Sequence, residues 1–487
     1  MTVALSDTGI LLRADTNRVL ARFFVPGRED LAPGASRAGG VVERVLALGE
    51  DQVERALELV LQKAGPHHRC LGEVLRAHAS NVISRVDPAV ELTDARLLLL
   101  GATFTREDSL EGAALCNPSI VPHPDQPHEG ATDFVLSVRG IGEGHRSSIG
   151  FRTGTVRDDG SVTLHAPGPY PETAVEHAGV HRRSVFLAQF TERENEPENI
   201  EFILEGLDDM FDDEQLEDRI SLLKADDVSR SNTLATVRDV RSLASSGYRA
   251  EFSADSELSE RVLWPHSPAE SHGLEDARFV RFVEDNGKVT YYATYTAFDG
   301  LHIQQHMLDT KDFRTFRSAP MTGAAAVGKG LAMFPRRVHG RFFALTRSDR
   351  ESNEVASSDD PRHWPDSQSV QIPERSWEMV QLGNCGSPIE TDLGWLVLTH
   401  GVGPMRTYSL GAILLDLDDP TRMIARTDEP ILSPEGDRTG GYVPNVVYTC
   451  GSMAHGDTLV LPYGIGDQAI AVATLSISEL LRAMRRV

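Results

Sequence analysis

A glycine-led strand pattern that occurs five times constrains the fold of this chain more than any other feature. Each copy has a turn glycine, a short apolar or aromatic run and a closing polar residue, which is typical of a hairpin turn that leads into a buried strand. The last four glycines are residues 287, 340, 394 and 456, so they stand 53, 54 and 62 positions apart. The five copies occupy residues 130–139, 287–295, 340–347, 394–400 and 456–463.

The near-regular spacing predicts a repeat architecture. A period of roughly 50 residues built from strands is typical of propeller blades. Five copies therefore predict an all-β five-bladed β-propeller core over residues 111–487. The first interval, 287 − 130 = 157 residues, fits one repeat plus an insertion of roughly 100 residues. A β-sandwich with evenly spaced hairpins is the alternative interpretation.

Two segments carry a helical pattern instead. Residues 1–110 place apolar residues at three- and four-residue spacing, as in 53–61, and predict a mainly helical N-terminal module. Residues 185–246 are strongly charged and predict a helical insertion outside the propeller. The N-terminal module is a candidate for contacts between copies of the chain in a homo-oligomer.

Composition narrows the partners that the chain can have. The 487 residues include 48 Lys and Arg against 72 Asp and Glu, a net charge of −24, which argues against nucleic acid and anionic membranes as partners. The four cysteines stand far apart, which argues against a disulfide scaffold and a structural zinc site. No secretory signal and no membrane-length apolar run is visible, so we expect a cytoplasmic protein.

The polar residue that closes each repeated strand is the first place to look for a site, because propeller strands converge on an axial funnel. Three of these five residues are cationic or imidazole groups, which suggests a polar pocket for hydroxyls and an anion. The five closing residues are Arg139, Tyr295, Arg347, His400 and Tyr463.

Adjacent acids precede the second repeated strand. Glu275 and Asp276, followed by Arg278, predict one carboxyl group in the funnel as a general acid and the other paired with the arginine. An acidic turn in an acidic protein is the alternative. Residues 323–330 come close to a phosphate-binding loop, but glycine replaces the required Ser or Thr at 330 and Pro335 prevents the helix that should follow, so we expect no nucleotide site.

Together these segments resemble glycoside hydrolase family 130, the β-mannoside phosphorylases and β-mannosidases. The resemblance spans roughly residues 112–155 and 265–480, and its pieces occur in the family's order. They are residues 117–120, 273–278, 295–300, 329–335, 340–347, 358–364, 394–401, 408–416 and 463–467.

The resemblance implies a five-bladed propeller, an inverting mechanism and one essential acid. By motif position that acid is Asp276, although Ala277 stands where the family usually has proline. In phosphorolytic members a basic cluster holds inorganic phosphate, and the matching residues are Lys329, Arg347 and His400. The expected substrate-binding residues are Arg139, Glu275, Arg278, Tyr295, Asp299, Tyr408 and Asp467.

The resulting hypothesis is a β-mannoside phosphorylase that transfers mannosyl from a short β-mannoside to phosphate and yields α-mannose 1-phosphate. It requires an oligosaccharide substrate and phosphate as co-substrate, with no cofactor or metal. Two alternatives stay open. An inverting β-mannosidase needs a second carboxylate roughly 6.5–9.5 Å from the acid, for which Glu390, Glu429 and Glu435 are candidates. A non-catalytic carbohydrate-binding propeller is the other alternative, and it needs neither a general acid nor a second carboxylate.

Overall fold

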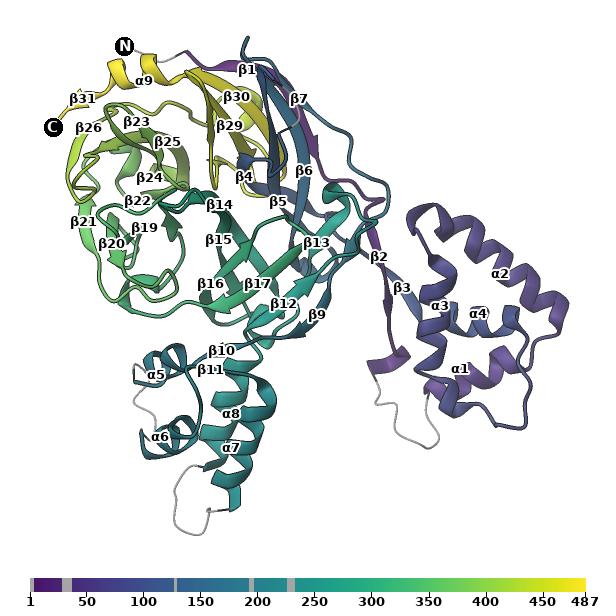
Figure 1. Cartoon of the computed structure of the whole chain (residues 1–487). Coiled ribbons are helices and arrows are strands. Elements are labelled where there is room, and N and C mark those ends of the chain that lie inside the picture. The colour runs from purple at the N-terminus through teal and green to yellow at the C-terminus, as the bar shows by residue number, and fades with distance from the viewer. Residues whose placement is uncertain (1–3, 29–36, 127–128, 192–196, 226–232) are drawn as a thin grey trace. The chain divides into compact units, whose positions relative to one another are not determined.

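The computed structural model describes residues 4–28, 37–126, 129–191, 197–225 and 233–487. The chain forms two compact units (Figure 1). Unit 1 consists of Met1–Ala14, Ala113–Pro167 and Thr173–Val487, and unit 2 of Asp15–Gly112 and Gly168–Glu172. Within the described residues, no helix has the length and apolar character needed to cross a membrane.

In its described residues, unit 2 has four helices and one antiparallel pair of strands, β2 and β3. The helices bury their apolar faces, including Val42, Val53 and Leu100, in a shared core. Gly101 allows two helices to pack closely, since a Cβ atom there would lie 1.8 Å from the carbonyl oxygen of Leu75. The elements are β2 (Val19–Phe23), α1 (Arg37–Leu46), α2 (Glu50–Ala64), α3 (Leu71–Ser80), α4 (Asp94–Thr103) and β3 (Thr105–Ser109).

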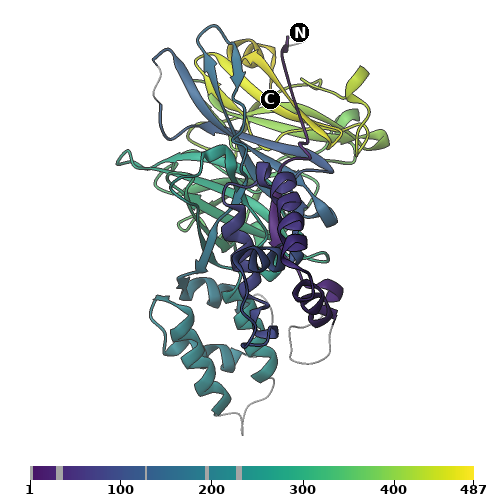
Figure 2. The ribbon, with the colours of Figure 1, turned by 90° about the vertical axis from the view of Figure 1, so that its right-hand side faces the viewer.

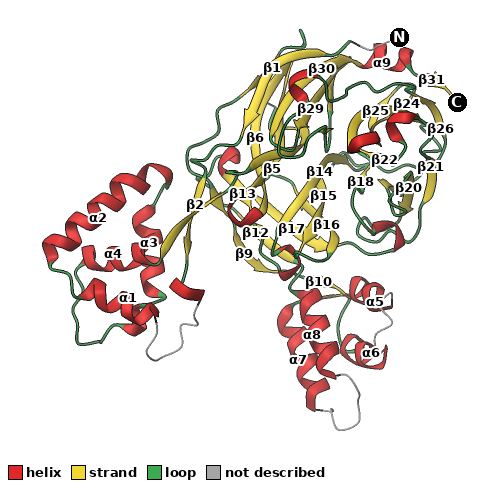
Figure 3. Ribbon diagram, turned by 180° about the vertical axis from the view of Figure 1, so that it is seen from behind, coloured by secondary structure: helices red, strands yellow, loops and turns green. Residues whose placement is uncertain are grey.

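Unit 1 is mostly β, as predicted, and its strands form antiparallel groups in chain order (Figures 1 and 3). The first two groups are joined into one sheet by a single parallel bridge between Ser147 and Gly273. The groups are β4 (Ala114–Pro122), β5 (Ala131–Ile141) and β6 (Ser147–Arg157); β14 (Gly273–Val283), β15 (Val289–Phe298), β16 (Ile303–Thr310) and β17 (Thr315–Pro320); β18 (Ala332–Met333), β19 (Phe342–Thr346), β20 (Asn353–Ser358) and β21 (Gln368–Gln371); β22 (Gln381–Asn384), β23 (Ile389–Thr391), β24 (Gly394–Gly403), β25 (Thr407–Leu415) and β26 (Met423–Arg426); and β27 (Val447–Tyr448), β28 (Met453–His455), β29 (Thr458–Ile465) and β30 (Ala469–Ser476).

The five repeated segments predicted as strands are all strands. They are β5, β15, β19, β24 and β29, and each pairs antiparallel with the strand that follows it. The N-terminal residues depart from the expected helical module, because β1 (Ser6–Arg13) pairs with β30 in unit 1, with Leu12 opposite Ile470. The alternating burial of β1 explains this placement, since the strand lays one face on a sheet.

The described residues between the first two strand groups include four helices, in the region where the sequence predicts a charged insertion. They are grouped together in Figure 2 and share a core that includes Phe186, Ile203, Ile220 and Val240. They are α5 (Arg183–Thr191), α6 (Pro197–Glu205), α7 (Asp213–Ala225) and α8 (Thr233–Ala244). A short hairpin of β10 (His181–Arg182) and β11 (Met210–Phe211) accompanies them, and β9 (Val175–Ala178) and β12 (Tyr248–Glu251) extend the sheet beside β17.

A buried polar network under β15 makes stability depend on pH. The Tyr295 hydroxyl contacts Glu270, Ser318 and Nδ1 of His306, the last at 3.2 Å. Burial lowers the pKa of His306 to about 3, against about 6.5 in an unfolded chain. Between these values the unfolded chain binds a proton that the native chain does not, so stability falls as the pH falls.

We therefore expect the free energy of unfolding to lose about 2 kcal/mol through His306 between pH 6.5 and pH 5. His306→Gln should remove this part of the pH dependence in urea titrations at the two pH values. His302→Gln, at an exposed imidazole, is the control and should leave the loss unchanged. Equal losses in the wild type and His306→Gln would contradict the expectation.

Candidate active site

A break in the pairing of β14 presents two neighbouring carboxylates to one arginine. The β14–β15 register shifts between Glu275 and Arg278, and Asp276 adopts a left-handed backbone with φ of 57°. From β5, Arg139 Nη1 donates to Asp276 Oδ1 at 3.0 Å and Nη2 donates to Glu275 Oε1 at 2.5 Å. The Asp276 side chain is 14% exposed. The predicted acid is thus nearly enclosed and held by a guanidinium.

The second carboxylate has a different partner from the one predicted. Glu275 pairs with Arg139 and with Lys329, whose Nζ lies 2.6 Å from Glu275 Oε2. Arg278 instead donates to the backbone oxygen of Asp276 at 2.9 Å and to the Tyr448 hydroxyl at 2.8 Å. The bulge is the physical reason, because the extra residue re-aims the side chains on either side of it.

The side chains around Asp276 are called the cluster from here on. Its carboxyl groups Asp276 and Asp467 have pKa values shifted in opposite directions. Burial raises the pKa of Asp276, but the charges of Arg139, Lys329 and Arg278 outweigh it, and its pKa lies below the usual value. Burial and the charge of Asp276 raise the pKa of Asp467, against a smaller lowering by Arg139. Opposite shifts in neighbouring carboxyl groups are typical of sites that use one as a proton carrier.

Arg347 and the imidazole of His400 form the cationic side of the cluster, in which Arg347 carries the charge. Arg347 Nη1 donates to His400 Nε2 at 3.4 Å. Burial lowers the pKa of His400 well below its usual value, and Arg347 and Arg278 lower it further, so the imidazole is neutral and accepts this bond. Among the described residues, Arg347 has no carboxylate within ion-pair distance. Asp349 interacts with its charge without forming an ion pair, so the partly buried guanidinium can still bind an anionic ligand.

Three aromatic rings line the same region. His400 stacks on Tyr408 with ring centroids 5.9 Å apart and meets Tyr448 edge-on at 5.0 Å. Tyr448 in turn accepts the bond from Arg278, which connects the cationic side to the backbone of Asp276. Sequence reasoning missed Tyr448 because β27 is a two-residue strand without the repeated pattern.

Two predicted residues do not join this cluster. Tyr295 is fully buried, with its hydroxyl in the network around Glu270. In the β14–β15 register Thr294 lies opposite Arg278 and Thr296 opposite Glu275, so these threonines share the site's face and Tyr295 points to the other side. Asp299 caps a turn, where its Oδ1 accepts from the backbone nitrogens of Leu301 and His302.

Tyr463 is likewise a core residue, at 2% exposure. Of the five closing residues, Arg139, Arg347 and His400 therefore lie in the cluster and the two tyrosines lie in cores. The error came from treating each closing position as equivalent, since a shift of one residue turns a strand side chain to the opposite face.

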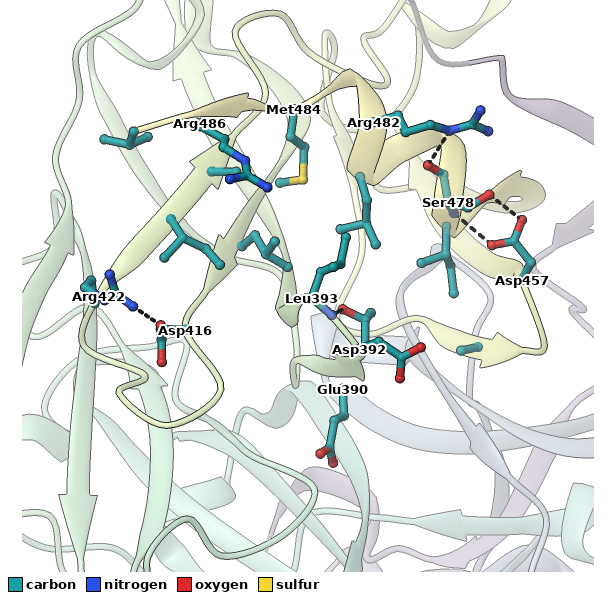
Figure 4. A pocket seen from close by; sticks show the side chains of 18 of the residues that line it. Glu390, Asp392, Leu393, Asp416, Arg422, Asp457, Ser478, Arg482, Met484 and Arg486 are labelled. Atoms are coloured by element: carbon teal, nitrogen blue, oxygen red, sulfur yellow. Dashed lines mark hydrogen bonds and ion pairs between the residues drawn. The ribbon is translucent and has the colours of Figure 1, made fainter.

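A large pocket lies away from this cluster. It has a volume of about 940 Å³ and includes Glu390, Asp392, Arg482 and Met484 (Figure 4). Glu390 pairs in β23 with Trp395 at the start of β24, five residues and roughly 17 Å along the strand from His400. Its carboxylate binds Arg336. Glu390 is thus unsuitable as a hydrolytic base beside Asp276, and Glu429 and Glu435 are exposed residues between strands.

An enclosed acid in one cluster with a guanidinium and a neutral imidazole, on a mostly β scaffold, has the chemistry of an enzyme that transfers glycosyl groups. Residues 247–486 match the family model described as beta-1,4-mannooligosaccharide phosphorylase. A 1,2-beta-oligomannan phosphorylase of Thermoanaerobacter sp. is 34% identical over 227 residues, which cover 46% of this chain and 75% of that protein. The chain therefore belongs to glycoside hydrolase family 130, and the prediction of a β-mannoside enzyme is confirmed.

Two further proteins are similar to parts of this chain. A beta-1,2-mannobiose phosphorylase of Listeria innocua is 32% identical over 229 residues, 46% of this chain and 63% of that protein. The solved structure of a Listeria innocua beta-1,2-mannobiose phosphorylase in complex with beta-1,2-mannobiose covers 82% of this chain and 95% of its own, with 23% identity and a TM-score of 0.46. The family model does not extend over residues 112–155, where the sequence also resembles the family.

Proposed function

We propose that this chain is an inverting β-mannoside phosphorylase that converts a short β-mannoside and inorganic phosphate into α-mannose 1-phosphate and the shortened sugar. The observation that carries the proposal is Arg347, a guanidinium without a carboxylate partner among the described residues, beside neutral His400 and in the same cluster as Asp276. Phosphate supplies the missing negative charge. The phosphorylase names of the relatives support the same assignment.

In the proposed reaction Asp276 gives a proton to the glycosidic oxygen as the bond from that oxygen to the anomeric carbon breaks. A phosphate oxygen attacks the opposite face of the carbon, so the configuration inverts. Arg347, His400 and Lys329 hold the phosphate, and Asp467, Tyr408, Arg139, Glu275 and Arg278 bind or orient the sugar and the acid. Bound phosphate also offsets the cations that lower the pKa of Asp276, which favours its protonated form.

The proposal includes a five-bladed propeller for the strands of unit 1. Five antiparallel groups follow one another in chain order around a common centre (Figure 1), and β1 completes the last group beside β30. The proposed domains are a helical module within residues 1–110 and a catalytic propeller in 111–487 that carries the helical insertion.

The direct test measures products with and without phosphate. The purified chain is incubated with β-1,2-mannobiose and β-1,4-mannobiose, and mannose and mannose 1-phosphate are quantified. We expect mannose 1-phosphate only with phosphate present, and faster from the 1,2-linked substrate because two relatives at 32–34% identity are 1,2-specific by name. Cleavage that is equally fast without phosphate would refute phosphorolysis and favour the hydrolase.

A glycine beside Arg347 and His400 offers a separate prediction. Gly383 of β22 lies opposite His400, and a Cβ atom there would come within 2.7 Å of His400 Cε1 and 3.2 Å of Arg347 Cδ. Gly383→Ala must displace both side chains, so we expect the KM for phosphate to rise at least about fivefold, roughly 1 kcal/mol of binding. Gly150→Ala, whose Cβ would make ordinary contacts at 3.7 Å and beyond, should leave it unchanged. Unaltered phosphate kinetics in a folded Gly383→Ala chain would contradict the arrangement.

A further inference from the structure

A second cavity lies where the helical insertion meets the sheet, apart from the cluster around Asp276. It has a volume of about 680 Å³ and is lined by residues of β9, β10, α5, α8 and β12 and by residues of β15, β16 and β17. Phe186, Met307 and Pro320 supply apolar wall. Small-molecule sites commonly have volumes of about 300–1,000 Å³ with mostly apolar walls and a few polar groups.

The charge of this cavity is opposite to that of the protein. The chain carries a net charge of −24, yet six basic residues line the cavity against three acidic ones, Glu284, Asp309 and Asp360, a surplus of 6 − 3 = 3 positive charges. The basic residues are Arg182, Arg249, Lys288, Lys311, Arg317 and Arg362.

Arg249 pairs with Glu251 at 2.7 Å, but the acids in the lining do not satisfy the other cations. Asp309 is shared, since Arg317 Nη2 and Arg362 Nη2 each lie 2.7 Å from one of its oxygens. Arg182 reaches Asp360 only at 3.3 Å. Within the described residues, Lys288 and Lys311 form no ion pair with an acid.

The lack of acceptors for these cations is clearest at Arg362. Its Nε is buried and has no hydrogen-bond partner among the described residues. Burial lowers the pKa of its guanidinium below the usual value against the charge of Asp309, and Arg182 and Arg317 lower it further. A buried donor without an acceptor is unfavourable, and an anion beside this guanidinium would offset its uncompensated charge.

We propose that this cavity binds a small phosphate monoester, with the phosphoryl group between Arg182, Lys311 and Arg362 and the organic part against the apolar wall. A dianion with three acceptor oxygens matches a surplus of three charges supplied by planar guanidinium and point-like ammonium groups. The walls belong both to the helical insertion and to the strands next to β14, so an occupant joins the insertion to the part of the sheet that carries Asp276. The site is independent of the reaction proposed above.

The test uses phenyl phosphate, a monoester with an apolar body, and isothermal titration of the full chain carrying Arg347→Ala, which removes the anion site of the reaction centre. We expect saturable binding of one phenyl phosphate per chain, tighter than inorganic phosphate. Adding Arg182→Ala and Lys311→Ala, both at exposed side chains, should weaken binding more than tenfold. Arg238→Ala, at an exposed arginine of the same insertion, is the matched control and should change the Kd less than twofold.

The outcomes separate the two proposals. No saturable binding in the Arg347→Ala chain, or binding that the double substitution leaves unchanged, would overturn the second site. Because no mannoside and no turnover enter the titration, an absence of phosphorolysis would refute only the proposed reaction. When both sites exist, the wild-type chain should bind two phenyl phosphates. The number should fall to one in Arg347→Ala, and also in a chain that keeps Arg347 but carries Arg182→Ala and Lys311→Ala.

Discussion

Replacing Asp276 by asparagine should lower kcat for β-mannobiose by about 10²–10⁴-fold, the range attributed to a positioned general acid. Asparagine keeps an oxygen for Arg139 Nη1 and tolerates the left-handed backbone at this position, so the fold and the KM for phosphate should change little. The loss should be smaller with an aryl β-mannoside, because a good leaving group needs less help from a proton. Initial rates with both substrates measure the difference.

The matched control is Asp299→Asn. This aspartate also lies within a segment that resembles the family, but it caps an exposed turn, and the amide oxygen can replace the carboxylate oxygen that accepts from Leu301 and His302. Its kcat should stay within about threefold of the wild type. If Asp276→Asn retains more than a tenth of the activity on mannobiose, another group is the acid, and Asp467, whose pKa is raised, becomes the first to examine.

Arg347→Ala should raise the KM for phosphate more than tenfold, about 1.4 kcal/mol or more of lost binding, while the KM for the mannoside changes little. The reason is that Arg347 meets neutral His400 and has no acid within ion-pair distance among the described residues, so an anion is the natural partner of its charge. Steady-state kinetics with each substrate varied in turn give both constants.

Arg341→Ala serves as control, since this arginine lies just before the same strand, β19, and pairs at the surface with Asp359. It should leave both constants unchanged. Loss of mannoside affinity with phosphate dependence intact in Arg347→Ala would identify Arg347 as a sugar ligand and favour the hydrolase.

The strands were predictable because turn glycines and apolar runs are local signals, and β5, β15, β19, β24 and β29 carry them in sequence. Which side chains come together in the site could be predicted only from their positions along those strands. Arg139 and His400 reach the cluster because their strands present that face, whereas Tyr295 fails by a single residue of register. Side chains alternate between the two faces of a strand, so the face of a given residue cannot be assigned reliably when the residue at which the strand begins is unknown.

The partners within the site depend on long-range geometry that the sequence does not encode locally. The pairing of Lys329 with Glu275 and of Arg278 with Tyr448 requires the bulge at Asp276 and segments up to 170 residues apart. The departure of residues 6–13 from the N-terminal module has the same origin, because only the sheet formed by the C-terminal strands explains why β1 is a strand.

That pairing of β1 with β30 sets an order for biosynthesis. Leu12 leaves the ribosome 470 − 12 = 458 residues before its partner Ile470, which at about 5–20 residues per second is a delay of roughly 20–90 s. Throughout that time the first strand lacks its partner, and the strand groups between them form before it can pair. A nascent chain stalled before residue 469 should therefore remain a substrate for chaperones and proteases even with the residues around Asp276 already folded.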